Sequence, residues 1–190
     1  SFEFLHGLEV TRCVGGETGW EPRYLVAELE GEVWGAMAVY KKTNSQGEFI
    51  FDWAWADAAY RVGLPYYPKL TSTVPFSPVT GPRFLVAEVA SSYTQEVHDA
   101  LIEALRQLAI DESASGLHLL FITPKEEAFC YWRGLLIRHT TQFQLCNQEY
   151  RSFDHFLEQF RSKRRNQIKR ERTRVREAGV VVRALVGDEP

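Results

Sequence analysis

Side chains that could form a ligand site are concentrated between residues 49 and 84. Nine of these 36 positions are aromatic, whereas the chain as a whole is 13% aromatic, and five of the eight prolines also lie here. A core strand excludes proline, and a disordered linker lacks large aromatic residues. The segment is therefore typical of a long ordered loop that lines a groove for a small ligand.

The candidate substrate-binding residues combine aromatic, cationic and anionic side chains. They are Asp52, Trp53, Trp55, Asp57, Tyr66, Tyr67, Lys69, Phe76 and Arg83. Two carboxylates five residues apart could hold an amine or accept a proton from it. Tyrosine hydroxyls beside an ammonium suit a phosphate, a carboxylate or a sugar, and a guanidinium offers a planar fork to an anion. The pattern identifies no catalytic base.

Each of these groups also has a structural interpretation. The two tryptophans could be core residues, with Asp52 a strand-end partner and Asp57 a helix cap. A strand over residues 48–53 that continued further would place Asp52 on the face opposite to both indole rings. Lys69 could simply be solvated, and the proline-rich loop before Arg83 could be a rigid connection. At these positions we weigh binding and structural roles side by side.

A second concentration of charge lies toward the C-terminal end. Residues 161–176 contain nine basic side chains and one acidic side chain, a net charge of +8, while the rest of the chain carries −11. The candidate contacts to phosphate or RNA are Lys163, Arg164, Arg165, Lys169 and Arg170. Such a helix could bind a polyanion by releasing its counterions, or lie solvated against the acidic remainder. Aromatic residues for stacking against single strands are not interleaved.

Composition places the chain among ordinary globular proteins. It is 45% hydrophobic and 25% charged, and neither a signal peptide nor a transmembrane segment of about 20 apolar residues is predicted. Three widely spaced cysteines without a CxxC motif indicate reduced thiols and a cytoplasmic location. No metal site is expected, because histidine and cysteine do not cluster. Coenzyme A normally requires a Q/R-x-x-G-x-G/A loop, which is absent, so we expect no cofactor within these 190 residues.

Helical and strand patterns alternate along the chain and predict an α+β fold. Helices are predicted over residues 2–14, from Ser92 toward Gly116, over 123–132, from Ser152 to 160, and over 162–178. Strands are predicted over residues 24–29, 33–40, 48–53, 117–122, 138–147 and 180–186. Short turns between the early strands favour antiparallel pairing, with helices packed on a mixed sheet.

Several stretches resemble one bacterial family. They are FDWAWAD at residues 51–57, YYPKL at 66–70, VPFSPVTGPR at 74–83, and the segment 153–174 that contains SKRRNQIKRE. They are similar to FemAB-like proteins of peptidoglycan biosynthesis or recognition, within the Gcn5-related N-acetyltransferase (GNAT) superfamily, whose order of elements this chain shares. The resemblance spans nearly the whole chain. It implies a first GNAT-like domain at residues 1–140 and the beginning of a second, truncated one at 141–190.

Better-known Fem-type relatives transfer an amino acid from aminoacyl-tRNA to the peptide stem of a cell-wall precursor. The resemblance therefore implies an acyl- or aminoacyl-transferase that acts on an amine of a small-molecule or muropeptide substrate. Its donor would be acyl-coenzyme A or aminoacyl-tRNA, and the 190-residue piece alone is expected to be inactive. The alternatives are a non-catalytic module that recognises a cell-wall peptide or nucleotide-sugar, and an RNA-binding protein that uses the basic helix. A terminal strand without sheet partners also predicts either a homodimer or disorder near the C-terminus.

Overall fold

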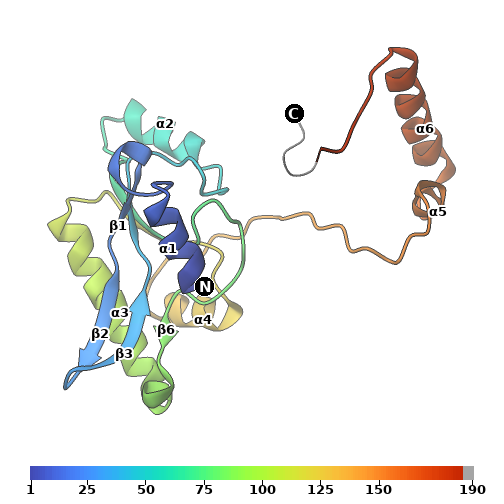
Figure 1. Cartoon of the computed structure of the whole chain (residues 1–190). Helices are drawn as coiled ribbons and strands as arrows, with labels where there is room; N and C mark the ends of the chain where they lie inside the picture. The colour runs from blue at the N-terminus through green and yellow to red at the C-terminus, as the bar shows by residue number, and fades with distance from the viewer. Residues whose placement is uncertain (186–190) are drawn as a thin grey trace. The chain divides into compact units, whose positions relative to one another are not determined.

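The computed structural model describes residues 1–185, which form six α-helices and seven short β-strands (Figure 1). The chain divides into two compact units, residues 1–140 and 141–190. All seven strands belong to the first unit, and the second contains α5 (Phe153–Glu158) and α6 (Ser162–Glu177). No helix of the described part is both long enough and apolar enough to cross a membrane.

The strands form two small sheets. They are β1 (Trp20–Pro22), β2 (Leu25–Leu29), β3 (Glu32–Met37), β4 (Tyr40–Lys42), β5 (Lys69–Ser72), β6 (Leu85–Val86) and β7 (Leu117–Leu119). One sheet has the order β1-β4-β5-β7 and the other the order β2-β3-β6. All pairs are antiparallel except β5 with β7, which is parallel. The predicted α+β fold with a mostly antiparallel, GNAT-like arrangement is confirmed.

The hydrophobic core lies between these strands and the longest helix, α3 (Thr94–Asp111). Val97, Leu101 and Leu105 of its predicted apolar stripe are buried against residues of β3 and β5. Strand β3 approaches the helix closely at Gly35, where an added Cβ would lie 2.4 Å from a methyl group of Val97. The apolar stripe of α3 therefore covers one face of the strands, and the side chains on the opposite face contact other segments of the chain.

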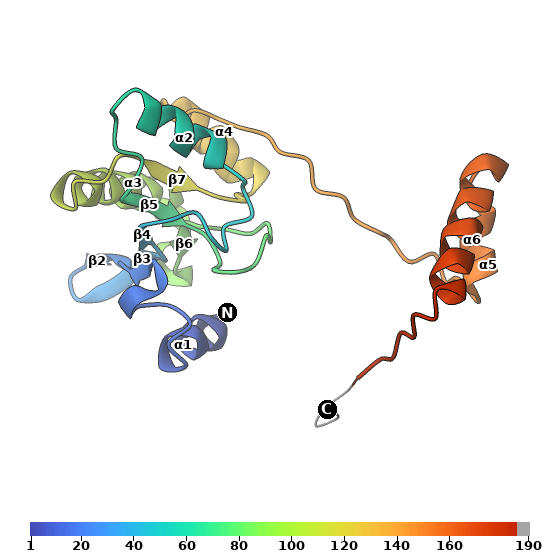
Figure 2. The same cartoon turned by 90° about the horizontal axis from the view of Figure 1, so that it is seen from above.

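The remaining helices of the first unit are α1 (Phe2–Val10), α2 (Trp53–Arg61) and α4 (Pro124–Trp132). In the view of Figure 2, the strands lie between α1 and α2. The predicted capping box at the start of α4 is confirmed, because the Thr123 hydroxyl accepts from the Glu126 N–H and the Glu126 carboxylate accepts from the Thr123 N–H. The predicted cap at Ser152 is also confirmed, since its hydroxyl accepts from the His155 N–H.

Several predicted elements were wrong or misplaced. The first helix ends at Val10, and α3 begins at residue 94 after a 3₁₀ turn, without the expected cap from Ser92. Residues 48–52 form no strand, because the positive φ angles of Phe49 (60°) and Phe51 (50°) interrupt an extended backbone.

The later strand predictions were also wrong in part: one strand is shorter than expected, and the others are absent from the described residues. Strand β7 ends at residue 119 and lies at the edge of its sheet, where the apolar run to 122 had suggested a central position. Residues 138–147 are irregular and pair with no strand of the described chain. Residues 180–185 form no strand either, and residue 186 of that prediction lies outside the described residues.

A buried carboxylate ties α4 to the loop that precedes β6. Glu126 accepts hydrogen bonds from the backbone N–H groups of Arg83 and Phe84, in addition to that of Thr123. The Arg83 guanidinium donates to the carbonyl oxygens of Leu120 (2.8 Å) and Val79 (2.7 Å). The two charged side chains thus satisfy backbone groups that the short strands β6 and β7 leave without ladder partners.

Replacing Glu126 with alanine is expected to lower the free energy of unfolding by about 3 kcal/mol, because three backbone N–H groups, two buried and one partly buried, lose their acceptor at about 1 kcal/mol each. Urea denaturation followed by circular dichroism measures this loss. Glu127→Ala on the same helix is the matched control, since Glu127 is only half-buried. Equal losses in the two variants would contradict the bracing role of Glu126.

Candidate functional site

One face of the four-stranded sheet carries buried polar side chains. Tyr40 lies opposite Thr71, and Lys42 lies opposite Lys69, on the antiparallel pair β4–β5. Directly paired residues project to the same face of a sheet. Thr71 is also paired with His118 of β7, so this residue belongs to the same face. Both lysines are 0% exposed, which is rare for this residue type unless the charge is compensated.

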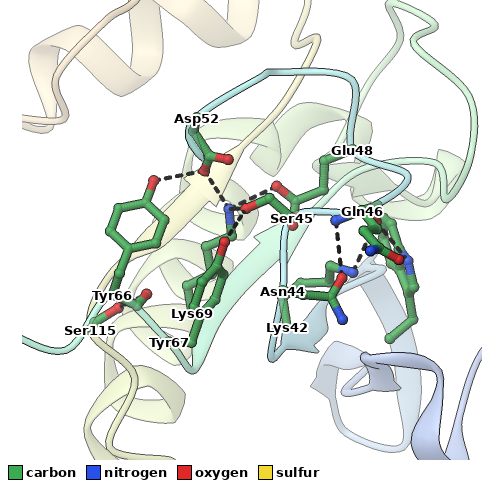
Figure 3. A network of polar contacts seen from close by, with 11 residues as sticks. Lys42, Asn44, Ser45, Gln46, Glu48, Asp52, Tyr66, Tyr67, Lys69 and Ser115 are labelled. Carbon is green, nitrogen blue, oxygen red and sulfur yellow. Dashed lines mark hydrogen bonds and ion pairs between the residues drawn. The ribbon is translucent and has the colours of Figure 1, made fainter. Parts of the chain in front are cut away.

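The compensation comes from residues 43–52, which we name the strap. This segment leads from β4 to α2 and covers both lysines (Figure 3). The Lys69 ammonium donates to Ser45 Oγ at 2.9 Å, to Glu48 Oε2 at 2.7 Å and to Asp52 Oδ2 at 2.6 Å. All three of its protons are therefore engaged, and two carboxylates share one cation.

Two tyrosines close the other side of this network. Tyr66 donates its hydroxyl proton to Asp52 Oδ2 at 2.7 Å, and the hydroxyls of Tyr67 and Ser45 are hydrogen-bonded at 2.7 Å. Both tyrosines directly precede β5, so the strand that carries Lys69 also positions these hydroxyls (Figure 3). The two rings pack edge to face with centroids 5.1 Å apart.

The second lysine is held more loosely. Lys42 Nζ donates one hydrogen bond to the Gln46 carbonyl oxygen at 3.3 Å and lies 3.5 Å from the centroid of the Trp20 ring. The indole N–H of Trp20 donates to the same carbonyl at 3.1 Å. The Lys42 ammonium therefore depends on a cation–π contact and on nearby carboxylates for much of its stabilisation. We name the whole group the strap site: Lys42, Ser45, Glu48, Asp52, Tyr66, Tyr67 and Lys69.

The pKa values of the two carboxyl groups are shifted in opposite directions. It raises the pKa of Glu48 above its usual range, although the hydrogen bond and charge of Lys69 act against this. Burial would also raise the pKa of Asp52, but hydrogen bonds from Lys69, Tyr66 and Ser45 outweigh it and the pKa is lowered. Asp52 is therefore the fixed anion of the site, and Glu48 is the carboxyl group more ready to accept a proton.

Burial also acts on the basic groups. It lowers the pKa of Lys42 to about 7, assisted by the charge of Lys69, whereas Glu48 and Asp52 oppose the shift. The pKa of His118 falls to about 4, mainly through burial and secondly through Lys69. The imidazole is hence neutral at physiological pH, whereas Lys42 titrates close to it.

Several polar atoms of this region have no partner. Glu48 Oε1, Asp52 Oδ1 and Thr71 Oγ1 are buried and make no hydrogen bond within the described chain. Buried polar groups are nearly always satisfied by protein or water, so these atoms have hydrogen-bonding capacity that the chain itself does not use. The two carboxylate oxygens can only accept hydrogen bonds, and a group that enters here must supply donors.

The structure brings together four of the predicted substrate-binding residues: Asp52, Tyr66, Tyr67 and Lys69. Asp52 directly precedes α2 and makes no side-chain cap bond, so it follows neither the strand-end interpretation nor the alternation expected of a strand. Phe76 borders the group through Trp20, with ring centroids 5.3 Å apart. Whether these residues bind substrate stays a prediction, but their proximity is a property of the fold.

The other predicted residues lie apart from this network. Trp53 and Trp55 are 58% and 62% exposed on α2, so they neither fill the core nor wall the strap site. Asp57 pairs with Arg61 on the helix surface at 2.6 Å. The Arg83 guanidinium is buried and engaged by backbone carbonyl oxygens, as described above, instead of facing a groove.

Sequence reasoning missed three members of the strap site: Lys42, Ser45 and Glu48. A signal for Lys42 was its place in a strand two residues after Tyr40, which put a lysine on a buried face. No comparable local signal existed for Ser45 or Glu48, because both lie in a turn-like segment and are placed by contacts with β5.

The basic helix α6 is exposed along most of its length. Lys169 makes an ion pair with Asp154 at 3.0 Å, and Arg164 donates to Gln167 at 3.0 Å. Lys163, Arg165 and Arg170 are the other members of the predicted phosphate- or RNA-contacting set. Their role in RNA binding stays a prediction.

The fold and the strap site define an α+β, GNAT-like protein with a buried charged network. The family itself is given by comparison with family models: that of the FemAB-like proteins, described as peptidoglycan biosynthesis/recognition, matches residues 1–189. The chain belongs to the FemAB-like family. Neither a curated protein nor a solved structure matches it.

Proposed function

We propose that this protein transfers an acyl or aminoacyl group to an amine of a cell-wall-related substrate, and that the strap site receives this amine. The family description supports the substrate class. The observation that carries the proposal is the pair of buried carboxylates, Glu48 and Asp52, each with one oxygen that lacks a hydrogen-bond partner. Perturbed ionisable groups in close contact are characteristic of functional sites.

The chemistry of the proposed reaction assigns different tasks to the two carboxylates. Asp52, whose pKa is lowered, would hold the substrate amine in its protonated form by charge and hydrogen bonding. Glu48, whose pKa is raised, would take one proton from the ammonium and leave a neutral nucleophile. The amine nitrogen then forms the new C–N bond with the donor carbonyl carbon, and the bond from that carbon to the donor oxygen or sulfur breaks. The departing oxygen or sulfur takes the proton that the nitrogen loses on forming the amide.

The donor in this proposal is an acyl-coenzyme A or an aminoacyl-tRNA. Both carry phosphates, for which the exposed lysines and arginines of α6 are the candidate contacts. On this proposal, a change in α6 affects donor binding and leaves acceptor binding unchanged. The two halves of the proposed reaction can therefore be assayed separately.

A second function, recognition of a cell-wall peptide without turnover, is favoured by the burial of the strap site. Glu48, Asp52 and Lys69 are each at most 1% exposed and are bonded mainly to one another. A network with no exposed surface can hold a loop in place for binding without taking part in a reaction. This alternative predicts affinity for a muropeptide and no product.

Replacing Asp52 with asparagine is expected to reduce transfer at least 100-fold, because the isosteric amide cannot hold an ammonium by charge. The measurement is product formation from a muramyl pentapeptide, with acetyl-coenzyme A and aminoacyl-tRNA supplied in turn as donors. Asp57→Asn is the matched control, since Asp57 lies on the surface of the adjacent helix. A thermal unfolding curve verifies that each variant is folded.

Two results would count against this assignment. Unchanged transfer by a folded Asp52→Asn variant would remove Asp52 from the mechanism. Tight binding of the muropeptide by the wild-type protein, without product from either donor, would support the recognition function instead.

A further inference from the structure

We infer that the strap site binds a primary ammonium group, and that Lys42 releases a proton when this additional cation enters. The inference rests on the proposed function for the identity of the cation as the acceptor amine. Binding and proton release are nevertheless properties of the site alone, and they can be measured without any transfer reaction.

The chemistry already present around Lys69 favours an ammonium group as the ligand. Its side chain ends in a primary ammonium, and the strap surrounds that group with three oxygen acceptors, those of Ser45, Glu48 and Asp52, at 2.6 to 2.9 Å. The same two carboxylates have one further oxygen each that lacks a partner. A donor-rich cation is the ligand class that satisfies these acceptors, whereas an anion would be repelled by them.

The net charge of the buried residues links ligand binding to the loss of a proton. Lys42 and Lys69 balance Glu48 and Asp52, so the four residues are neutral when all are ionised. An additional ammonium would leave an uncompensated positive charge away from water, which is strongly unfavourable. Neutrality returns if one of the two lysines loses its proton.

The contacts of the two lysines identify Lys42 as the one that loses its proton. Lys69 has three short hydrogen bonds, two of them to carboxylates, that hold its proton. Lys42 has one hydrogen bond of 3.3 Å to a neutral carbonyl, and burial has already lowered its pKa to about 7. The titratable groups that act on Lys42 are Glu48 and Asp52 from the strap and Lys69 from β5. From β1, it meets only the neutral ring of Trp20.

Entry of a ligand requires the strap to open, and its backbone favours this. Phe49 and Phe51 adopt left-handed φ angles of 60° and 50°, which are unfavourable for bulky residues. Opening relieves this cost, and the aromatic side chains of both residues are already exposed. The closed strap is therefore held chiefly by its bonds to Lys42, Lys69 and the two tyrosines.

The test is a calorimetric titration with Nα-acetyl-lysine methylamide, whose side chain presents a primary ammonium. The norleucine analogue has the same length without the charge and serves as the control ligand. At pH 6, titration in two buffers of different ionisation enthalpy is expected to show about one proton released per ligand bound. Because Lys42 is mostly protonated at pH 6 and mostly neutral at pH 8, affinity is expected to be about tenfold weaker at pH 6.

The Lys42→Met variant tests whether the released proton comes from Lys42 or from another group. The variant is expected to bind the probe equally well at pH 6 and pH 8 and to release no proton. Lys125→Met, at an exposed position on α4, is the matched control and should retain the wild-type pH dependence. If Lys42→Met does not fold, the proton count of the wild-type protein at the two pH values decides the question by itself.

Three outcomes would overturn the inference: no saturable binding of the probe at concentrations up to roughly 10 mM, well above a millimolar Kd; equal binding of the norleucine analogue; or unchanged proton release in Lys42→Met. Transfer activity without ammonium binding would overturn the inference and leave the proposed transfer reaction intact, with the amine received elsewhere. Ammonium binding without transfer from any donor would support the inference and contradict the proposed transfer reaction.

Discussion

Replacing Lys69 with methionine is expected to lower the free energy of unfolding by about 3–5 kcal/mol. Methionine has a similar length and fills the same space, so the loss is mainly electrostatic. Without the ammonium, Glu48 and Asp52 stay buried beside each other and lose the cation that both contact at 2.6–2.7 Å. Guanidinium chloride denaturation, followed by far-ultraviolet circular dichroism, measures this change.

The matched control is again Lys125→Met, which removes one positive charge from an exposed position. Its effect is expected to stay within about 0.5 kcal/mol, as for most surface substitutions. A double variant, Glu48→Gln with Lys69→Met, removes one buried charge of each sign and should recover part of the loss, because Lys42 and Asp52 then balance each other. A Lys69→Met variant as stable as its control would show that the strap does not depend on this ammonium.

The parts of the fold that could be predicted from the sequence depend on local interactions. The Thr123–Glu126 capping box and the apolar stripe of α3 involve residues three or four positions apart, and such spacing is visible in the sequence. The strand predicted at 48–53 failed because its alternating aromatic residues had no sheet to join. The backbone at Phe49 and Phe51 turns away from the extended conformation, and Asp52 instead precedes a helix.

The strap site could be predicted only in part, for a related reason. Asp52, Tyr66, Tyr67 and Lys69 lie within one segment of unusual composition, and composition was enough to select them. Lys42 enters the site through the register of β4 against β5, which places it opposite Lys69. Register is set by the packing of whole strands, so a local motif does not reveal it.

The burial of four ionisable groups supports a functional role for the strap site over a purely structural one. A protein selected only for stability gains little from such a network, since apolar residues of similar size are often as stable or more stable. The FemAB-like membership of the chain gives the network a context in which retained charges are useful, because an amine substrate needs both a counter-ion and a proton acceptor. The network and the family description therefore support the same proposal independently.

The stability of the wild-type protein is expected to rise with pH between about 7 and 10, and Lys42→Met is expected to remove this rise. Burial lowers the pKa of Lys42 to about 7 from its usual 10.5. Between these values the unfolded chain holds a proton that the folded protein has lost, so increasing pH favours the folded state. The stability associated with a neutral Lys42 is complete above pH 10.5 and is lost as the pH falls through 7.

The slope approaches at most about 1.4 kcal/mol per pH unit for one proton. Urea denaturation at pH 7, 8 and 9 measures it in the wild-type protein and in Lys42→Met. Lys125→Met should retain the wild-type slope, because its lysine is exposed in the folded protein. A slope that persists in Lys42→Met would assign the titration to another group. It would also remove the basis for proton release on ammonium binding, since a lysine that is not destabilised by burial has no reason to surrender its proton to an incoming cation.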